Sequence, residues 1–193
     1  MYKNRMHMYA YSDCLRRTKN KKIGHEWVAF FDGDEYLWLA PAWRARGIRP
    51  FLKQYTYAGA LGVQWVYHGS DGRVKRPKDG VRKSYVSCLH DNMHHIKSMI
   101  HIPFGAQPIT PHHFWLAKNK TTVTETHEVI PGPFAITAST ENISLHHYVI
   151  RSEEDFAKKV AKGGELGSLK DWEFFGIVVN TSLEICPELV EWD

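Results

Sequence analysis

The stretch Trp27–Leu39, WVAFFDGDEYLWL, decides how the fold of this chain is predicted. Five apolar residues run directly into three carboxylates, Asp32, Asp34 and Glu35, and the apolar run then resumes. WVAFF is apolar on both faces, which is typical of a buried strand in a parallel sheet rather than a half-exposed antiparallel strand. Burying an unpaired charge is costly. Either the chain leaves the core at Asp32, or a cation lies at the end of the strand.

The carboxylates have the spacing of a site for a hard cation. In an extended segment Asp32 and Asp34 point to the same side, because side chains repeat every two residues. Carboxylate oxygens suit Mg²⁺ or Mn²⁺, and both ions also accept phosphate oxygens. Gly33 leaves room for a ligand near the backbone. The alternative is a turn in which Asp and Gly serve the backbone conformation.

Alternating helix and strand patterns around this stretch predict a single α/β domain. The clearest helix has Ser152 as N-cap, Asp155 at the third helical position, lysines near its C-terminus and Gly163 as its stop. Further helices are expected at 5–19, where Met6, Tyr9 and Leu15 share a face, and at 49–55, 84–93 and 169–179. Strands are expected at 27–31, 60–69, 95–102, 121–130 (exposed) and 143–150.

Charge and hydropathy limit the classes of partner. The net charge of +4 is too small to argue for nucleic acid. No apolar run reaches membrane-spanning length, and the first residues lack a signal-peptide core. Cys14, Cys88 and Cys186 do not make a disulfide framework and match no zinc motif, which favours a reducing compartment. We therefore expect a soluble protein without a transmembrane segment, with the cytoplasm favoured.

Several segments together resemble GT-A glycosyltransferases related to families 2 and 92. HEWVAFFDGDEYLWL is similar to their D-x-D-E segment, LGVQWVYHGSDG to their NW-x-x-FGSSG stretch, and HHYVIRSEEDFAKKVAKG to their HY-x-x-KS-x-x-x-F-x-x-K-x-x-x-G. HIKSMI and PHHF lie between them in the family's order. The resemblance covers about residues 8–164, and 165–193 is expected to be a helical tail. It implies a GT-A-like mixed sheet flanked by helices.

The resemblance also implies an activity: transfer of a sugar from a nucleotide-sugar donor to a glycan or other acceptor hydroxyl, with inversion. It implies that Asp34 binds Mn²⁺ or Mg²⁺, that Asp32 faces the metal or the donor's ribose, and that His147 completes the metal site. Lys97 and Arg151 are candidates for neutralising the diphosphate, although the family usually has Lys at the latter position. His146 is expected on the opposite face of its strand, as a core or surface residue.

Two features depart from the family pattern. Asp71 replaces a usual Ser, and it is either a turn residue or the base that deprotonates the acceptor; Asp91 is the other candidate base. Only 31 residues precede Asp32, fewer than a GT-A domain spends on its nucleoside-binding strands. We therefore expect an N-terminally truncated domain that binds its donor weakly. Its exposed sheet edge beside 27–31 would favour self-association.

Two alternatives remain open at this point. In a histidine-ligated metallohydrolase, His90 and His94 would share a helix face and bind one metal, with additions from His112 and His113. In a non-catalytic sugar-binding domain, the numerous Trp and Tyr side chains would stack on sugars, although most are more simply explained as core.

Overall fold

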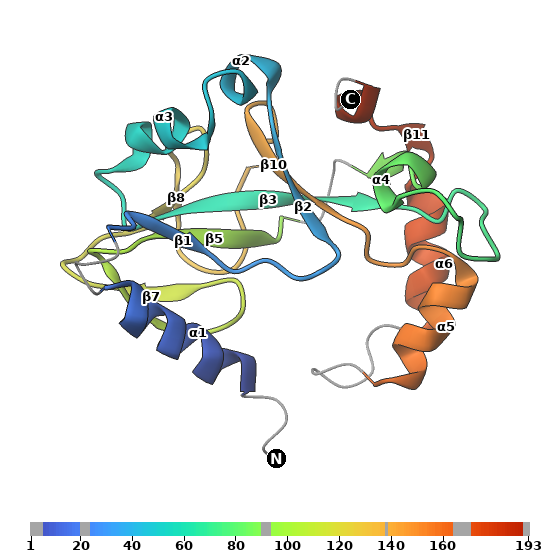
Figure 1. Cartoon of the computed structure of the whole chain (residues 1–193), viewed down its shortest axis with the longest axis horizontal. Helices are drawn as coiled ribbons and strands as arrows, with labels where there is room; N and C mark the ends of the chain where they lie inside the picture. Colours follow the sequence, from blue (N-terminus) through green and yellow to red (C-terminus); the bar gives the residue numbers. More distant parts are fainter. Residues whose placement is uncertain (1–5, 20–23, 90–93, 138, 164–170, 191–193) are drawn as a thin grey trace. The chain divides into compact units, whose positions relative to one another are not determined.

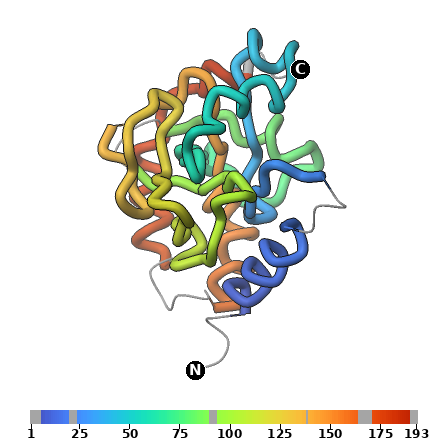
Figure 2. The backbone as a smooth tube through the Cα atoms, turned by 90° about the vertical axis from the view of Figure 1, so that its left-hand side faces the viewer, coloured from blue at the N-terminus to red at the C-terminus, as the bar shows by residue number. Residues whose placement is uncertain are grey.

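The fold is described from a computed structural model, which covers residues 6–19, 24–89, 94–137, 139–163 and 171–190. These residues are coloured in Figures 1 and 2. Its contacts divide the chain into two compact units. Unit 1 comprises the described residues within 1–33, 37–65 and 92–145, and unit 2 those within 34–36, 66–91 and 146–193. The two units are described separately below.

Unit 1 contains most of a sheet. Its strands follow the hydrogen-bonded order β1-β5-β3-β10-β2, and β8 also pairs with β3. Figure 1 shows the long strand β3 with β5 and β1 on one side of it. The last residues of β3 and β10 and the first two of β2 belong to unit 2. The bounds are β1 (Trp27–Ala29), β2 (Glu35–Leu39), β3 (Ala60–His68), β5 (Ile96–His101), β8 (Thr122–Val123), β9 (Val129–Ile130) and β10 (Ile143–His147).

The predicted parallel, buried strand at 27–31 is wrong. β1 is only three residues long, half-buried and antiparallel to β5, with Val28 opposite Ile100. It ends the strand order, and among the described residues β5 is its one strand partner. The ring of Trp27 stacks on His101, with 4.6 Å between centroids. A half-buried edge strand that packs against aromatic rings, such as that of His101, can be as apolar as a central parallel strand. The apolar composition of 27–31 therefore did not distinguish the two.

Helix α1 (Met6–Thr18) covers a small apolar cluster in unit 1. Leu15 is its fully buried residue, and it packs with Ile100 and Phe114. Tyr11 of the same helix stacks on Phe30 at 4.2 Å between centroids. The predicted helix is confirmed, but Met6 and Tyr9 are exposed, so the predicted apolar face is wrong. The other elements of unit 1 are α2 (Pro41–Arg44), α3 (Ile48–Leu52), the 3-10 turn η2 (Lys53–Tyr55), β6 (Gly105–Pro108) and β7 (Phe114–Leu116).

The segment predicted as one exposed strand at 121–130 forms two short strands, β8 and β9, that pair antiparallel. Both residues of β8 are buried, because β8 also pairs in parallel with β3. The Thr and Val content of 121–130 predicted extended structure. It did not predict that the chain turns back between β8 and β9, or that β8 is buried.

Unit 2 combines helices with a small antiparallel arrangement. The end of β3 pairs with β4, and β4 pairs with β11. A helix was predicted at 84–93, yet its described part includes strand β4, because pairing on both sides outweighs local preference. The helices predicted around 153–163 and 169–179 are confirmed. The bounds are α4 (Val81–Ser84), β4 (Ser87–Leu89), α5 (Glu153–Ala161), α6 (Trp172–Thr181), β11 (Glu184–Ile185) and α7 (Pro187–Val190).

Local capping fixes the start of α5. The hydroxyl of Ser152 accepts a hydrogen bond from the backbone N–H of Asp155, as predicted. Phe156 is fully buried and meets the rings of Trp172 and Phe175 from α6. The inner face of α5 is therefore defined by Phe156.

A disulfide joins Cys88 in β4 to Cys186, which follows β11, with 5.4 Å between the Cα atoms. Cys14 is unpaired. The expectation that the cysteines form no disulfide is therefore wrong. Disulfides are typical of oxidising compartments, so the argument for a reducing compartment no longer holds. No helix in the described part of the chain has the length and apolar character needed to span a bilayer. The fold is mixed α/β, and its sheet pairings are largely antiparallel.

Candidate functional site

Within unit 2, the carboxylate of Asp34 lies between two basic side chains. Its Oδ2 accepts a hydrogen bond from Lys159 Nζ at 2.8 Å, and its Oδ1 lies 3.6 Å from His147 Nε2. The Asp34 side chain is 16% exposed and that of His147 only 4%. We call Asp34, His147 and Lys159 the Asp34 cluster. The structure thus brings together Asp34 and His147, which are 113 positions apart in sequence (147 − 34).

Three elements hold the Asp34 cluster in place. Asp34 lies in the turn before β2, and its carbonyl oxygen accepts the backbone N–H of Tyr148 at 2.9 Å. This bond ties the turn to the end of β10, where His147 is the last residue. Lys159 comes from α5 and also donates to the carbonyl oxygen of Val149 at 2.9 Å. Backbone groups of Asp34 and Val149 therefore hold Asp34 and Lys159 against the end of β10.

Lys159 was not predicted as a site residue. The lysines at and just after the end of α5 (Lys158, Lys159 and Lys162) were interpreted as charges that favour a helix C-terminus, and that reasoning does not separate one from another. A signal was present in the sequence: Lys159 lies three residues after the buried Phe156, so both lie on one face of the helix. Its partner Asp34 is 125 positions away, beyond the reach of any local pattern.

The electrostatics of the cluster keep Asp34 ionised. Burial alone would raise its pKa, but the attraction of the His147 imidazole, together with the charge and hydrogen bond of Lys159, lowers the pKa well below its usual range. The carboxylate therefore carries a full negative charge at neutral pH. An ionised, mostly buried carboxylate beside an imidazole nitrogen is a suitable pair of ligands for a divalent cation.

Glu35, the third carboxylate of the opening stretch, begins β2 and is 8% exposed. Burial and the negative charge of Glu35 both raise the pKa of Tyr67. The ring of Tyr67 lies 5.5 Å from that of His147, between centroids. Tyr67 is therefore a neutral phenol that covers the imidazole of His147.

In unit 1, Asp32 has a different partner. Its Oδ2 accepts a hydrogen bond from Lys97 Nζ at 2.9 Å. The Lys97 side chain is 1% exposed, whereas that of Asp32 is 53% exposed. Lys97 is thus a buried cation neutralised by Asp32, and its Nζ also lies 5.9 Å from the centroid of Trp65. The backbone forms a turn at Gly33 and Asp34, so the predicted extended D-x-D segment is wrong.

The structure places the other predicted site residues as follows. Asp71 has a positive φ of 49°, and its carboxylate accepts the backbone N–H groups of Val86 at 2.5 Å and Ser87 at 3.0 Å. These bonds favour the turn role over the catalytic one. Arg151 also has a positive φ, 57°, and is half-buried. Asp91 lies outside the described residues.

His146 was predicted to be a core or surface residue, and the structure places it in the core. It is fully buried, and its Nδ1 lies 2.8 Å from Nε2 of His68 in β3. His147, the next residue, belongs to the Asp34 cluster. The two histidines therefore make different contacts, as the alternation of a strand requires.

The histidines proposed for a metallohydrolase are not gathered around one point. His112 bonds the carbonyl oxygen of Ile96 through Nδ1 at 2.8 Å, and burial lowers its pKa to about 4. Within the described ranges, neither His94, His112 nor His113 belongs to any group of three ligand atoms close enough to share a metal. His90 lies outside those ranges.

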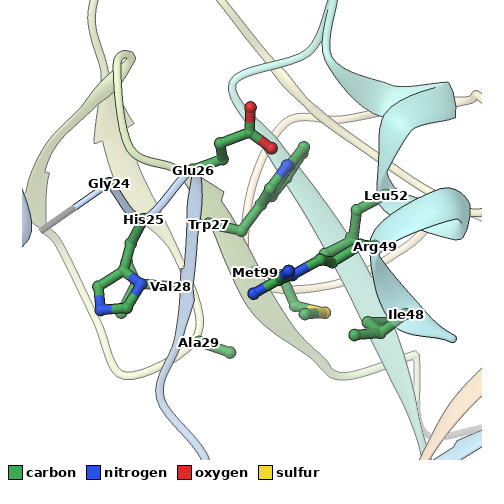
Figure 3. Close-up of a pocket in the computed structure, with 10 residues that line it drawn as sticks. All are labelled: Gly24, His25, Glu26, Trp27, Val28, Ala29, Ile48, Arg49, Leu52 and Met99. Atoms are coloured by element: carbon green, nitrogen blue, oxygen red, sulfur yellow. The ribbon is translucent and has the colours of Figure 1, made fainter.

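Unit 1 also has a cavity of about 420 Å³ between β1, α3 and β5. Figure 3 shows Arg49 from α3 beside Trp27 and Met99, with Glu26 on the other side of Trp27 from Arg49. None of the predicted site residues lines this cavity. Its lining mixes apolar side chains with the polar side chains of His25, Glu26 and Arg49.

Comparisons with known proteins add no relative. No model of a protein family matches the chain, and neither does any curated protein. Function is therefore argued from the geometry described above.

Proposed function

We propose that this chain is a metal-dependent glycosyltransferase of GT-A type, which moves a sugar from a nucleotide-sugar donor to an acceptor hydroxyl. The observation that carries the proposal is the 3.6 Å approach of Asp34 Oδ1 and His147 Nε2. The resemblance, which rests on sequence motifs alone, independently implies Asp34 and His147 as metal ligands. A chance pairing of two residues so distant in sequence, both in the resembling segments, is a weaker explanation.

The donor set fits Mn²⁺ or Mg²⁺. Ligand atoms that bind one ion at about 2.0–2.2 Å lie about 3–4 Å from each other. Asp34 Oδ1 and His147 Nε2 have this separation. Two protein ligands also suit ions that keep several waters and bind substrate phosphates. When bound, the ion would stabilise the negative charge of the leaving diphosphate.

The residues of the chain itself would perform three tasks. Lys159 holds Oδ2 of Asp34, so that Oδ1 keeps one orientation. The cation of Lys159 adds positive charge where the diphosphate would bind. In unit 1, Asp32 holds the buried Lys97.

The proposal is tested with Asp34→Asn, which keeps the shape of the side chain and removes its charge. Mn²⁺ affinity measured by calorimetry should fall at least tenfold, and release of nucleoside diphosphate from a donor should fall with it. Asp13→Asn is the control, because Asp13 is a carboxylate that pairs with Arg16 and Arg17 on α1. A folded Asp34→Asn protein with unchanged Mn²⁺ affinity would refute the metal assignment.

A further inference from the structure

A second group of potential metal ligands lies in unit 2, in residues outside the Asp34 cluster. One nitrogen each from His68 and His146 lies with Cys186 Sγ in a group whose atoms are all within 4.8 Å of one another. Cys88 Sγ is bonded to Cys186 Sγ, and these two sulfur atoms form a second group of this kind with a carboxylate oxygen of Glu188. We call His68, His146, Cys88 and Cys186 the Cys–His cluster. Their exposed fractions are 0% for His68, His146 and Cys186 and 3% for Cys88.

Separate elements fix the cluster. His68 at the end of β3 lies directly opposite Cys88 in the antiparallel pair of β3 and β4. β11 pairs with β4, and Cys186 then donates its backbone N–H to the carbonyl oxygen of Val86 at 2.9 Å. His146 comes from β10. Backbone pairing therefore positions the residues that carry these ligand atoms.

The orientation of His68 is the one found in metal-binding histidines. Its Nδ1 lies 3.1 Å from the carbonyl oxygen of Tyr85, an acceptor, so Nδ1 carries the proton in this contact. Nε2 then holds its lone pair toward His146 Nδ1. A ligating histidine typically donates its other N–H to a carbonyl or carboxylate in this way.

We propose that the Cys–His cluster binds one Zn²⁺ when the Cys88–Cys186 disulfide is reduced. Two thiolates and two neutral imidazoles form a tetrahedral set that Zn²⁺ prefers, and thiolate ligands select it over Mn²⁺ and Mg²⁺. The charges of two thiolates and one Zn²⁺ sum to zero, which a buried site requires. This inference does not rest on the proposed transferase activity.

The disulfide and the metal site exclude each other. A dithiol reductant exchanges with the Cys88–Cys186 bond, leaves as its own cyclic disulfide and supplies two electrons and two protons, which produce two thiols. Zn²⁺ then binds the two sulfurs and displaces their two protons. A disulfide oxidant reverses the sequence: it accepts two electrons from the two thiolates and two protons from solution, leaves as two thiols, and the Cys88–Cys186 bond forms as Zn²⁺ is released. The cluster is therefore a site whose metal content follows the redox state of its surroundings.

The test compares oxidised and reduced full-length chain. The protein is reduced with a phosphine, so that no added thiol competes for the metal, and is then titrated with Zn²⁺. The reduced chain should bind one equivalent of Zn²⁺ more than the oxidised chain. Co²⁺ in place of Zn²⁺ should give the charge-transfer absorption of thiolate ligation in the reduced chain alone. Zn²⁺ should also raise the Tm of the reduced chain by more than that of the oxidised chain.

Variants identify the ligands. His146→Asn keeps both cysteines and should lower Zn²⁺ affinity of the reduced chain at least tenfold. Replacing both Cys88 and Cys186 by Ser should abolish the Co²⁺–thiolate absorption. Cys14→Ser is the matched control, since Cys14 lies on α1 in unit 1, and it should change neither result. Asp34→Asn should leave the Co²⁺–thiolate absorption of the reduced chain intact, which separates this site from the proposed Mn²⁺ site. Equal Zn²⁺ binding by oxidised and reduced protein, or a reduced folded chain that binds none, would overturn the inference.

Discussion

Replacing Lys159 with Met removes the cation from Asp34 while keeping most of the apolar stem. The Lys159 side chain is 36% exposed and that of Asp34 is 16% exposed, so the pair lies between two limits. Exposed ion pairs contribute about 0–1 kcal/mol, and breaking a buried pair costs about 3–5 kcal/mol. Lys159 also donates to Val149. We therefore expect the free energy of unfolding to fall by about 1–2 kcal/mol.

The same substitution should have the opposite effect on metal binding. Two unit charges about 5 Å apart interact by about 3 kcal/mol at an effective dielectric constant of about 20. A divalent ion on Asp34 would feel twice this repulsion from Lys159, partly offset by rearrangement. We expect Lys159→Met to bind Mn²⁺ at least tenfold more tightly in the absence of nucleotide, and to bind a nucleoside diphosphate in Mn²⁺ more weakly.

Urea denaturation and calorimetry with Mn²⁺ measure these two effects. Lys158→Met is the matched control, because the neighbouring Lys158 is 57% exposed and pairs with Glu154 one helical turn away. It should cost at most about 0.5 kcal/mol and leave Mn²⁺ affinity unchanged. If the two variants behave alike in both assays, the role given to Lys159 is incorrect.

Three further predictions concern stability. Replacing both Cys88 and Cys186 by Ser should lower the free energy of unfolding by up to about 5 kcal/mol, given their separation of 98 residues, whereas Cys14→Ser should cost little; guanidinium denaturation compares them. Burial lowers the pKa of His112 to about 4, so below about pH 7 the unfolded chain takes up a proton that the folded chain excludes. The free energy of unfolding should therefore fall by up to roughly 3 kcal/mol between about pH 7 and pH 4. Thermal melts of His112→Gln should lack this part of the loss. Ser152→Ala removes the cap of α5 and should cost about 1 kcal/mol in urea denaturation.

Local signals in the sequence predicted local structure well. The start of α5 depends on Ser152 and its own first turn, and the strand β3 depends on a long run of apolar residues, so both were predicted. β4 was predicted as a helix because its conformation depends on pairing with β3 and β11. No local pattern carries that information.

The candidate site divides in the same way. The carboxylates of Asp32 and Asp34 were found because a charge directly after an apolar run is unusual, and His147 was found through the resemblance. The opening stretch raised the question of which cation offsets these carboxylates. The structure shows a lysine of the chain beside each of them, Lys97 beside Asp32 and Lys159 beside Asp34. These pairings join residues 65 and 125 positions apart, which only the fold brings together.

The disulfide between Cys88 and Cys186 also determines whether the two fragments separate after a protease cuts the backbone between these residues. The exposed residues Lys118 and Asn119 lie between the two cysteines in sequence, in a loop with positive φ angles. Cleavage after Lys118 would break the backbone once, yet the fragment that ends there and the fragment that begins at Asn119 would remain one covalent molecule. A nicked chain would therefore keep the mass of the intact one, apart from one added water, until a reductant separates its two pieces.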